Sequence, residues 1–200
     1  MQPKLQQWIS ITGRLLDTLF YFAPNSEQAQ KVLSFFNQSD WAEQLGVEPS
    51  AKINQLLASQ TDLAEQHQAM FIGPNALIAP PWGSVYLDPE SVIFGNSLLE
   101  LRTFLRQYQI EFSLNLAYDE PEDHIGLMLL LSAYLAENNP GLLNTFLSQH
   151  FFTWSKRYLQ LAGEQTEYPF YQGLALLTQQ VLQVWQEQLL LIVPNVTFYR

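Results

Sequence analysis

The chain has 200 residues, of which 48% are hydrophobic and only 14% are charged, so we expect a folded protein with a substantial core. The absence of cysteine excludes disulfides, iron–sulfur clusters, thiol catalysis and cysteine-based zinc sites. A net charge of −10 argues against nucleic acid as a partner, because phosphate binding requires clustered Lys and Arg.

Positive charge is also unevenly distributed along the chain. No Lys or Arg lies between Ile53 and Leu101, or between Gln107 and Ser155, although these two spans contain five and six acidic residues. This pattern favours a cationic partner. The alternative, that the acidic surface only keeps the protein soluble, remains open on charge alone.

The first residues do not resemble a signal peptide, since Lys4 is followed by a mixed segment that contains Arg14 and Asp17. No run approaches the roughly 18 consecutive apolar residues that span a bilayer. We therefore expect a cytoplasmic protein.

Apolar residues recur at helical spacing along most of the chain and predict an all-α fold. We expect one domain over residues 1–200 with about nine to eleven helices, many of them short. Residues 110–118 alternate like a strand or an extended connector, with no partner strand evident. The first two expected helices end near Phe22 and Phe36, and a short turn follows at 41–45. Four further helices begin near Pro49, Asp62, Asn96 and Asp119. The last three cover 142–152, 154–161, and Pro169 to about Leu191.

The stretch from Met70 to Ser91 differs from the helical segments around it. Gly73-Pro74 and Pro80-Pro81 interrupt it, and we expect a non-helical segment because proline fixes φ and disfavours helix in the residue before it. Its many apolar and aromatic residues favour a packed loop. Core packing and a peptide-binding groove are equally compatible with this composition.

A second unusual stretch runs from Asp119 to His124 and contains four carboxylates. Asp119 and Glu122 have the spacing of a capping box, which predicts that a helix begins here. We expect the two stretches to face each other across a groove, where the carboxylates receive guanidinium or ammonium groups. A metal site on Glu120 and His124 is disfavoured because too few other ligands have matching spacing.

No phosphate loop, dinucleotide fingerprint, nucleophile elbow or zinc-protease motif occurs in the sequence. We therefore expect a binding protein rather than an enzyme, with no cofactor and no metal.

Several motifs together resemble the TorD/DmsD family of redox-enzyme maturation chaperones, with most similarity to its DmsD branch. They are Phe71-Ile-Gly-Pro74, the run PPWGSVYLD from Pro80 to Asp88, Glu90-Ser91, and the run EPEDHIG from Glu120 to Gly126. Supporting matches extend over nearly the full length: Leu19-Phe-Tyr21, Leu101-Arg102, His150 to Ser155, and Pro169-Phe-Tyr171.

The resemblance implies an all-helical bacterial chaperone that binds the twin-arginine signal peptide of a molybdoenzyme, such as the dimethyl sulfoxide reductase catalytic subunit, and delays its export. It also implies contact with Tat translocase components at the inner membrane. We expect a monomer, and a domain-swapped dimer is the alternative. Two other functions stay open: a helical adaptor for a different cationic peptide, and a weak guanine-nucleotide-binding protein.

The resemblance also places the peptide-binding site. Its residues are Met70, Phe71, Pro81, Trp82, Ser84, Tyr86, Asp88, Glu120, Glu122, Asp123 and His124. The sequence departs from the family pattern at His67 and Asn75, where relatives often carry an aromatic residue. His67 and Asn75 are further candidates for the site. We expect Asp123 with Glu120 or Glu122 to receive the arginines, His124 to tune or orient that patch, and the apolar part of the peptide to contact Trp82, Tyr86 and Phe71. An Asp123→Ala variant should weaken binding while melting almost normally.

Overall fold

The computed structural model describes residues 2–110 and 120–200, and these residues form an all-α fold. No extended strand occurs in the described ranges, where the one β-type contact is an isolated bridge. The helices are α1 (Pro3–Tyr21), α2 (Glu27–Phe36), α3 (Trp41–Leu45), α4 (Ala51–Ala58), α5 (Leu63–His67), α6 (Ser84–Leu87), α7 (Asn96–Gln107), α8 (Ile125–Asn138), α9 (Pro140–Phe146), α10 (Phe152–Gly163) and α11 (Pro169–Gln188), with π-helical turns η1 (Gln68–Ile72) and η2 (Leu147–Phe151).

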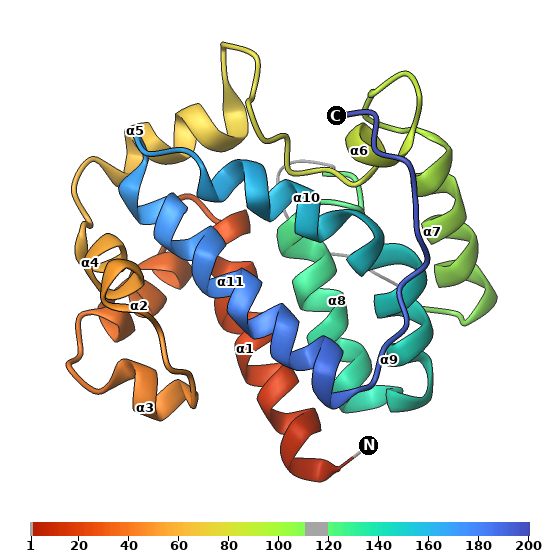
Figure 1. Cartoon of the computed structure of the whole chain (residues 1–200), viewed down its shortest axis with the longest axis horizontal. Helices are drawn as coiled ribbons and strands as arrows, with labels where there is room; N and C mark the ends of the chain where they lie inside the picture. The colour runs from red at the N-terminus through yellow and green to blue at the C-terminus, as the bar shows by residue number, and fades with distance from the viewer. Residues whose placement is uncertain (1, 111–119) are drawn as a thin grey trace.

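Helix α8 is the centre of the core. Its sequence is apolar on all sides, as expected for a helix surrounded by others, and ten of its residues are buried. Helix α1 packs along α8 in the most extensive helix–helix contact of the described residues. Helix α11 packs against α10 and α4. Figure 1 shows α2, α3 and α4 on one side of the α1–α11 pair and α7 on the opposite side.

Local sequence signals account for several helix ends. The Ser26 hydroxyl accepts a hydrogen bond from the Ala29 N–H at 3.2 Å, which confirms the predicted start of α2. Ser50 caps α4 in the same way, so this helix begins one residue after the cap rather than at Pro49. Helix α11 begins at Pro169 as predicted and ends at Gln188.

Two predictions about segments need correction. The stretch Met70–Ser91 is not entirely non-helical, because its first residues lie in η1 and Ser84–Leu87 forms α6. The predicted break after residue 152 is also wrong: α9 continues through η2 directly into α10. Most of the expected extended segment 110–118 lies outside the described residues. None of the described helices combines the length and hydropathy needed to cross a membrane.

The packing of α1 on α8 depends on a close approach at Gly13. A Cβ atom at this position would lie 2.8 Å from the Leu129 carbonyl oxygen and 3.2 Å from the Ala133 Cβ. A methyl group there must therefore push the two helices apart or strain them.

We expect Gly13→Ala to reduce the free energy of unfolding by about 1–3 kcal/mol, because overpacking outweighs the better helix propensity of alanine. Urea denaturation measures this loss. Gly141→Ala is the matched control, since the nearest atom to a Cβ there is 3.9 Å away, and it should leave stability unchanged or slightly raised. Equal stability of the two variants would contradict the close-approach argument.

Candidate functional site

The two unusual stretches of the sequence pair directly with each other. The Gly83 N–H donates to the Asp123 carbonyl at 3.1 Å, and the Ile125 N–H donates to the Pro81 carbonyl at 2.8 Å. These bonds form the isolated antiparallel bridge between Trp82 and His124. The prediction that the two stretches face each other is therefore confirmed at this bridge, whereas a peptide groove beside it stays a prediction.

Helix α8 begins at Ile125, not at Asp119. His124 is its N-cap, and its Nδ1 accepts the Gly126 N–H at 3.1 Å. The bond to Pro81 draws residues 120–124 away from helical geometry, so Glu122 lies in a turn before the helix. The expected capping box is thus absent at Glu122, and Asp119 lies outside the described residues.

Asp123 is a buried structural acid with only 4% of its surface exposed. Its Oδ2 accepts the Ser84 N–H at 2.7 Å, at the start of α6. Burial raises the pKa of Asp123 above its ordinary value, although the bond from Ser84 acts in the opposite direction. This carboxylate therefore fixes α6 to the start of α8 and does not present itself to an arriving arginine.

The two neighbouring glutamates differ in their surroundings. Glu122 already binds a guanidinium of the protein itself, since the Nε of Arg102 lies 3.0 and 2.9 Å from its two carboxylate oxygens. Glu120 is half-buried and accepts the indole N–H of Trp82 at 3.0 Å. Glu120 is thus partly exposed and lies next to an aromatic ring. Unlike Glu122, it forms no salt bridge within the described residues.

An aromatic cluster surrounds His124. Its ring lies 5.4 Å from the Tyr21 ring, 6.2 Å from Trp82 and 6.5 Å from Phe71, measured between centroids. Trp82 and Tyr21 are half-buried, whereas Phe71 and His124 are buried. The cluster therefore joins the predicted residues of both stretches to α1.

Tyr21 is the residue that the sequence-based site missed, although it belongs to the matched run Leu19-Phe-Tyr21. Burial raises its pKa to about 12, and the negative charges of Glu120 and Asp17 add to this effect. Its hydroxyl therefore stays protonated and available as a hydrogen-bond donor beside Glu120.

The histidines of the site are neutral. Burial lowers the pKa of His124 to about 3 and that of His67 to about 4. His67 packs against Phe71 at 5.0 Å and Tyr171 at 6.0 Å, and its Nε2 is buried without a partner among the described residues. His67 thus takes the place of an aromatic core residue. No group of three His, Asp or Glu side chains in the described ranges could bind a metal ion.

Three further predicted residues support the loop from inside. Tyr86 is fully buried, donates its hydroxyl to the Pro80 carbonyl at 2.8 Å and stacks on Trp154. The Asp88 carboxylate accepts the Asn96 N–H at 2.9 Å at the start of α7. Ser84 is also buried and contributes its N–H to Asp123.

The remaining predicted residues line a hollow of about 520 Å³ next to η1. Met70 and Asn75 contribute to it, together with Ile78 and Tyr168. Met70 is itself buried, whereas Asn75 is exposed and Ile78 is 56% exposed. Because Phe71 directly follows Met70, this hollow is continuous in sequence with the aromatic cluster at His124.

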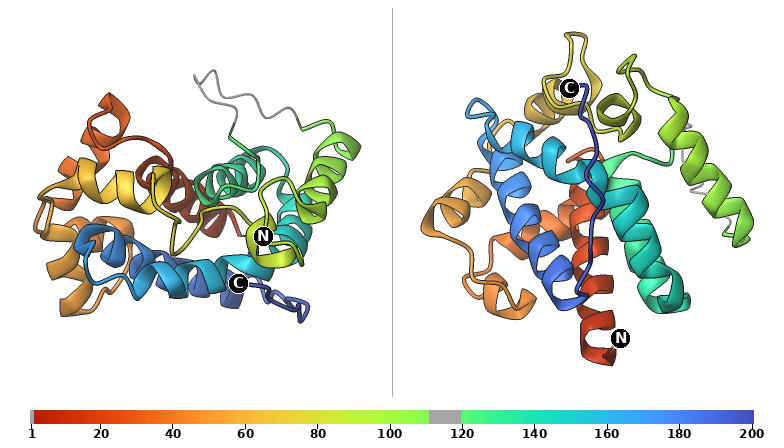
Figure 2. Two further views of the ribbon diagram at one scale, coloured as in Figure 1. Left: turned by 90° about the horizontal axis from the view of Figure 1, so that it is seen from above. Right: turned by 45° about the vertical axis from the view of Figure 1, so that its right-hand side comes forward.

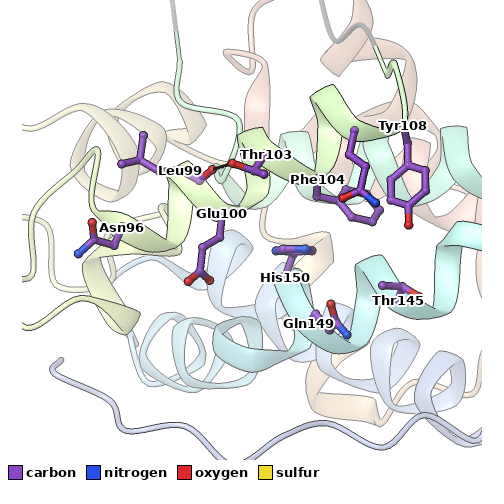
Figure 3. A pocket seen from close by; sticks show the side chains of 10 residues that line it. Asn96, Leu99, Glu100, Thr103, Phe104, Tyr108, Thr145, Gln149 and His150 are labelled. Atoms are coloured by element: carbon purple, nitrogen blue, oxygen red, sulfur yellow. Dashed lines mark hydrogen bonds between the residues drawn. The ribbon is translucent and has the colours of Figure 1, made fainter.

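A second hollow of about 660 Å³ is lined by none of the predicted site residues. It is formed by α7 with α9 and η2, and Figure 3 shows Glu100, Phe104, Tyr108 and His150 among its lining side chains. The ring of His150 lies 5.0 Å from that of Phe104. His150 belongs to the matched run His150 to Ser155, although the sequence did not assign it to a site.

The fold matches that of a solved maturation protein. The crystal structure of a redox enzyme maturation protein from Archaeoglobus fulgidus superposes with a TM-score of 0.57 at 21% identity, covering 92% of this chain and 96% of that one. This similarity defines the class of the fold, an all-α arrangement that the two proteins share.

Sequence comparison then identifies the family. A family model described as nitrate reductase delta subunit matches residues 37–160. A Haemophilus influenzae protein named "Probable Tat proofreading chaperone DmsD" is 53% identical over the whole of both chains, and the Tat proofreading chaperone DmsD of Salmonella typhimurium is 39% identical over 96% of this chain and 95% of its own. The chain belongs to the TorD/DmsD family of redox-enzyme maturation chaperones. The family, the all-α fold and the prediction of a chaperone rather than an enzyme are confirmed.

Asp123 should contribute to stability, contrary to the expectation from sequence. We expect Asp123→Ala to lower the free energy of unfolding by about 1–3 kcal/mol, because the buried Ser84 N–H loses its acceptor. Asp123→Asn retains an acceptor oxygen and should lose less than half as much. Thermal and urea unfolding of both variants test this, and wild-type stability of Asp123→Ala would show that the bond to Ser84 is dispensable.

His67 should make the protein sensitive to acid. Its pKa of about 4 in the folded state lies below the unfolded value of about 6.5, so between these pH values the unfolded state binds more protons. The contribution to stability is present above pH 6.5 and is lost as pH falls towards 4, with a slope of at most about 1.4 kcal/mol per pH unit.

His67→Phe removes this titration and keeps an aromatic ring beside Phe71. The variant should therefore gain stability relative to the natural chain as pH falls from 7 to 5. Urea unfolding at three pH values in that range measures the difference. A difference that does not change with pH would contradict burial of a neutral histidine.

Proposed function

We propose that this chain is a cytoplasmic chaperone that binds the twin-arginine signal peptide of a molybdoenzyme precursor. Binding would delay export by the Tat system until the cofactor is loaded and the enzyme has folded. The names of the relatives as Tat proofreading chaperones support this proposal. Resemblance to the DmsD branch supports a dimethyl sulfoxide reductase catalytic subunit as the client.

The observation that carries the proposal is the pairing of Glu120 with Trp82 beside the aromatic cluster. A carboxylate has about four lone-pair positions, so the bond from one indole N–H leaves capacity for a guanidinium. Trp82 offers an amphipathic face next to that charge, and arginine stacks well on such faces. Arg102 on Glu122 shows the same carboxylate–guanidinium pairing two residues away.

The apolar part of a signal peptide has a separate surface. Ile78 is exposed and lines the hollow that Met70 helps to form, and Ile72 is exposed next to Gly73, which also lines it. Phe71 is buried, and its ring lies 6.5 Å from that of His124 between centroids. A hydrophobic segment of a peptide that covers the exposed Ile78 side chain would bury apolar area.

Contacts with Tat translocase components would follow from the same role, since a chaperone that holds back a precursor must finally release it to the translocase. We propose that the chain acts as a monomer whose single domain spans residues 1–200. The negative net charge suits a partner that carries paired arginines.

Isothermal titration calorimetry tests the proposal with a synthetic twin-arginine leader of a dimethyl sulfoxide reductase catalytic subunit and with its Lys-Lys variant. We expect the Lys-Lys peptide to bind at least about tenfold more weakly, because ammonium groups cannot form bidentate bonds with a carboxylate. Failure of the first peptide to bind, or equal affinity for both, would overturn the proposal.

A Glu120→Gln variant tests whether Glu120 is the residue that binds the arginines of the leader. It keeps an acceptor for the Trp82 indole and removes only the charge, so the preference for Arg-Arg over Lys-Lys should shrink. Glu43→Gln on the exposed face of α3 is the matched control and should leave both affinities unchanged. An unaltered preference in Glu120→Gln would place arginine recognition elsewhere.

A further inference from the structure

The segment Val196–Arg200, which we call the strap, crosses the molecule after α11 has ended. It is extended and has no regular secondary structure. Figures 1 and 2 show the chain passing from the end of α11 to finish beside the loop that carries α6. Two segments far apart in sequence, the strap and residues 77–91, therefore lie together.

The backbone of Tyr199 is bonded on both sides. Its N–H donates to the Tyr86 carbonyl at 3.0 Å, and its carbonyl accepts the Ser91 hydroxyl at 3.4 Å. Helix α6 has only four residues, so its carbonyls have few intrahelical partners. The strap thus supplies a donor to Tyr86, as an added strand supplies donors to a free edge.

The side chain of Arg200 completes the contact. Its guanidinium donates to the carbonyls of Leu77 and Ile78, in the loop before Pro80. Its own carbonyl accepts the Nε–H of Arg157 at 3.1 Å. The loop therefore offers three carbonyl acceptors within ten residues. That of Tyr86 binds an extended backbone, and those of Leu77 and Ile78 bind a guanidinium.

The strap is attached at the surface and not through the core. Val196, Phe198 and Tyr199 remain 38%, 44% and 47% exposed. More than half of the surface of each of these side chains is covered, and the polar bonds of the strap add to this contact in offsetting the loss of conformational freedom on ordering. Such an attachment can exchange with another segment that brings the same donors.

We propose that residues 77–91 form a binding site for an extended, arginine-bearing peptide, which the strap occupies in the same chain and which a bound peptide takes over by displacing it. The identification of the natural competitor as the twin-arginine leader rests on the proposed function. Because the strap is tethered, its effective concentration at the site is high, and its presence weakens the apparent affinity for any free peptide. Release of the strap would therefore accompany client binding on the loop that also carries Trp82.

Fluorescence anisotropy tests the site with a labelled peptide of residues 191–200 and two chains, the full one and one that ends at Asn195. We expect the peptide to bind the shortened chain at least tenfold more tightly than the full chain. The peptide with Arg200→Gln should bind the shortened chain at least tenfold more weakly. Equal binding to both chains, or equal binding of both peptides, would overturn the proposal.

Hydrogen exchange at the Tyr199 amide tests displacement in the full chain, whether or not the shortened chain folds. Excess 191–200 peptide should accelerate this exchange at least tenfold, as should Arg200→Gln. Unchanged exchange at saturation would overturn the proposal.

Binding of the synthetic twin-arginine leader to the full and shortened chains separates competition with the strap from the chaperone role. A leader that binds both chains equally refutes the competition and leaves the chaperone role intact. A leader that binds neither refutes the chaperone role, while binding of the 191–200 peptide to the shortened chain would still support the site.

Discussion

The pairing of Pro81–Gly83 with Asp123–Ile125 is the constraint on which the rest of the site depends. Two backbone bonds join segments some forty residues apart, and they place Trp82 beside His124. The same contact ends the irregular run before α8, because His124 becomes its cap. Since α8 is the central helix of the core, this pairing fixes the loop directly to the core, and the bond from Ser84 to Asp123 strengthens the same junction.

The acidic stretch divides its charges between support and recognition. Asp123 is buried and fixes α6, and Glu122 is neutralised by Arg102. Glu120 keeps partial access to solvent beside Trp82. A cluster that looks uniform in sequence therefore has three different electrostatic environments, because burial and a neighbouring cation change what each carboxylate can bind.

The sequence correctly predicted those features of the fold that depend on residues close together in the chain. The helical class, the Ser26 cap and the start at Pro169 follow from local periodicity and capping preferences. The start of α8 did not follow, because a long-range bond to Pro81 overrides the local capping pattern. The burial of Asp123 and the contribution of Tyr21 were missed for the same reason: each depends on a segment that folds against it from far along the chain.

The π-helical turns η1 and η2 each accommodate one residue more than an α-helical turn does. An α-helix advances about 100° per residue, so one extra residue changes the rotational phase of everything beyond it. In η1 the Gly73 N–H donates to the Gln68 carbonyl five residues earlier at 2.9 Å, and Gly73 ends the turn with a φ of 97°. Loss of one residue from η1 would therefore rotate His67 by about 100° relative to Phe71 and away from Tyr171, on α11.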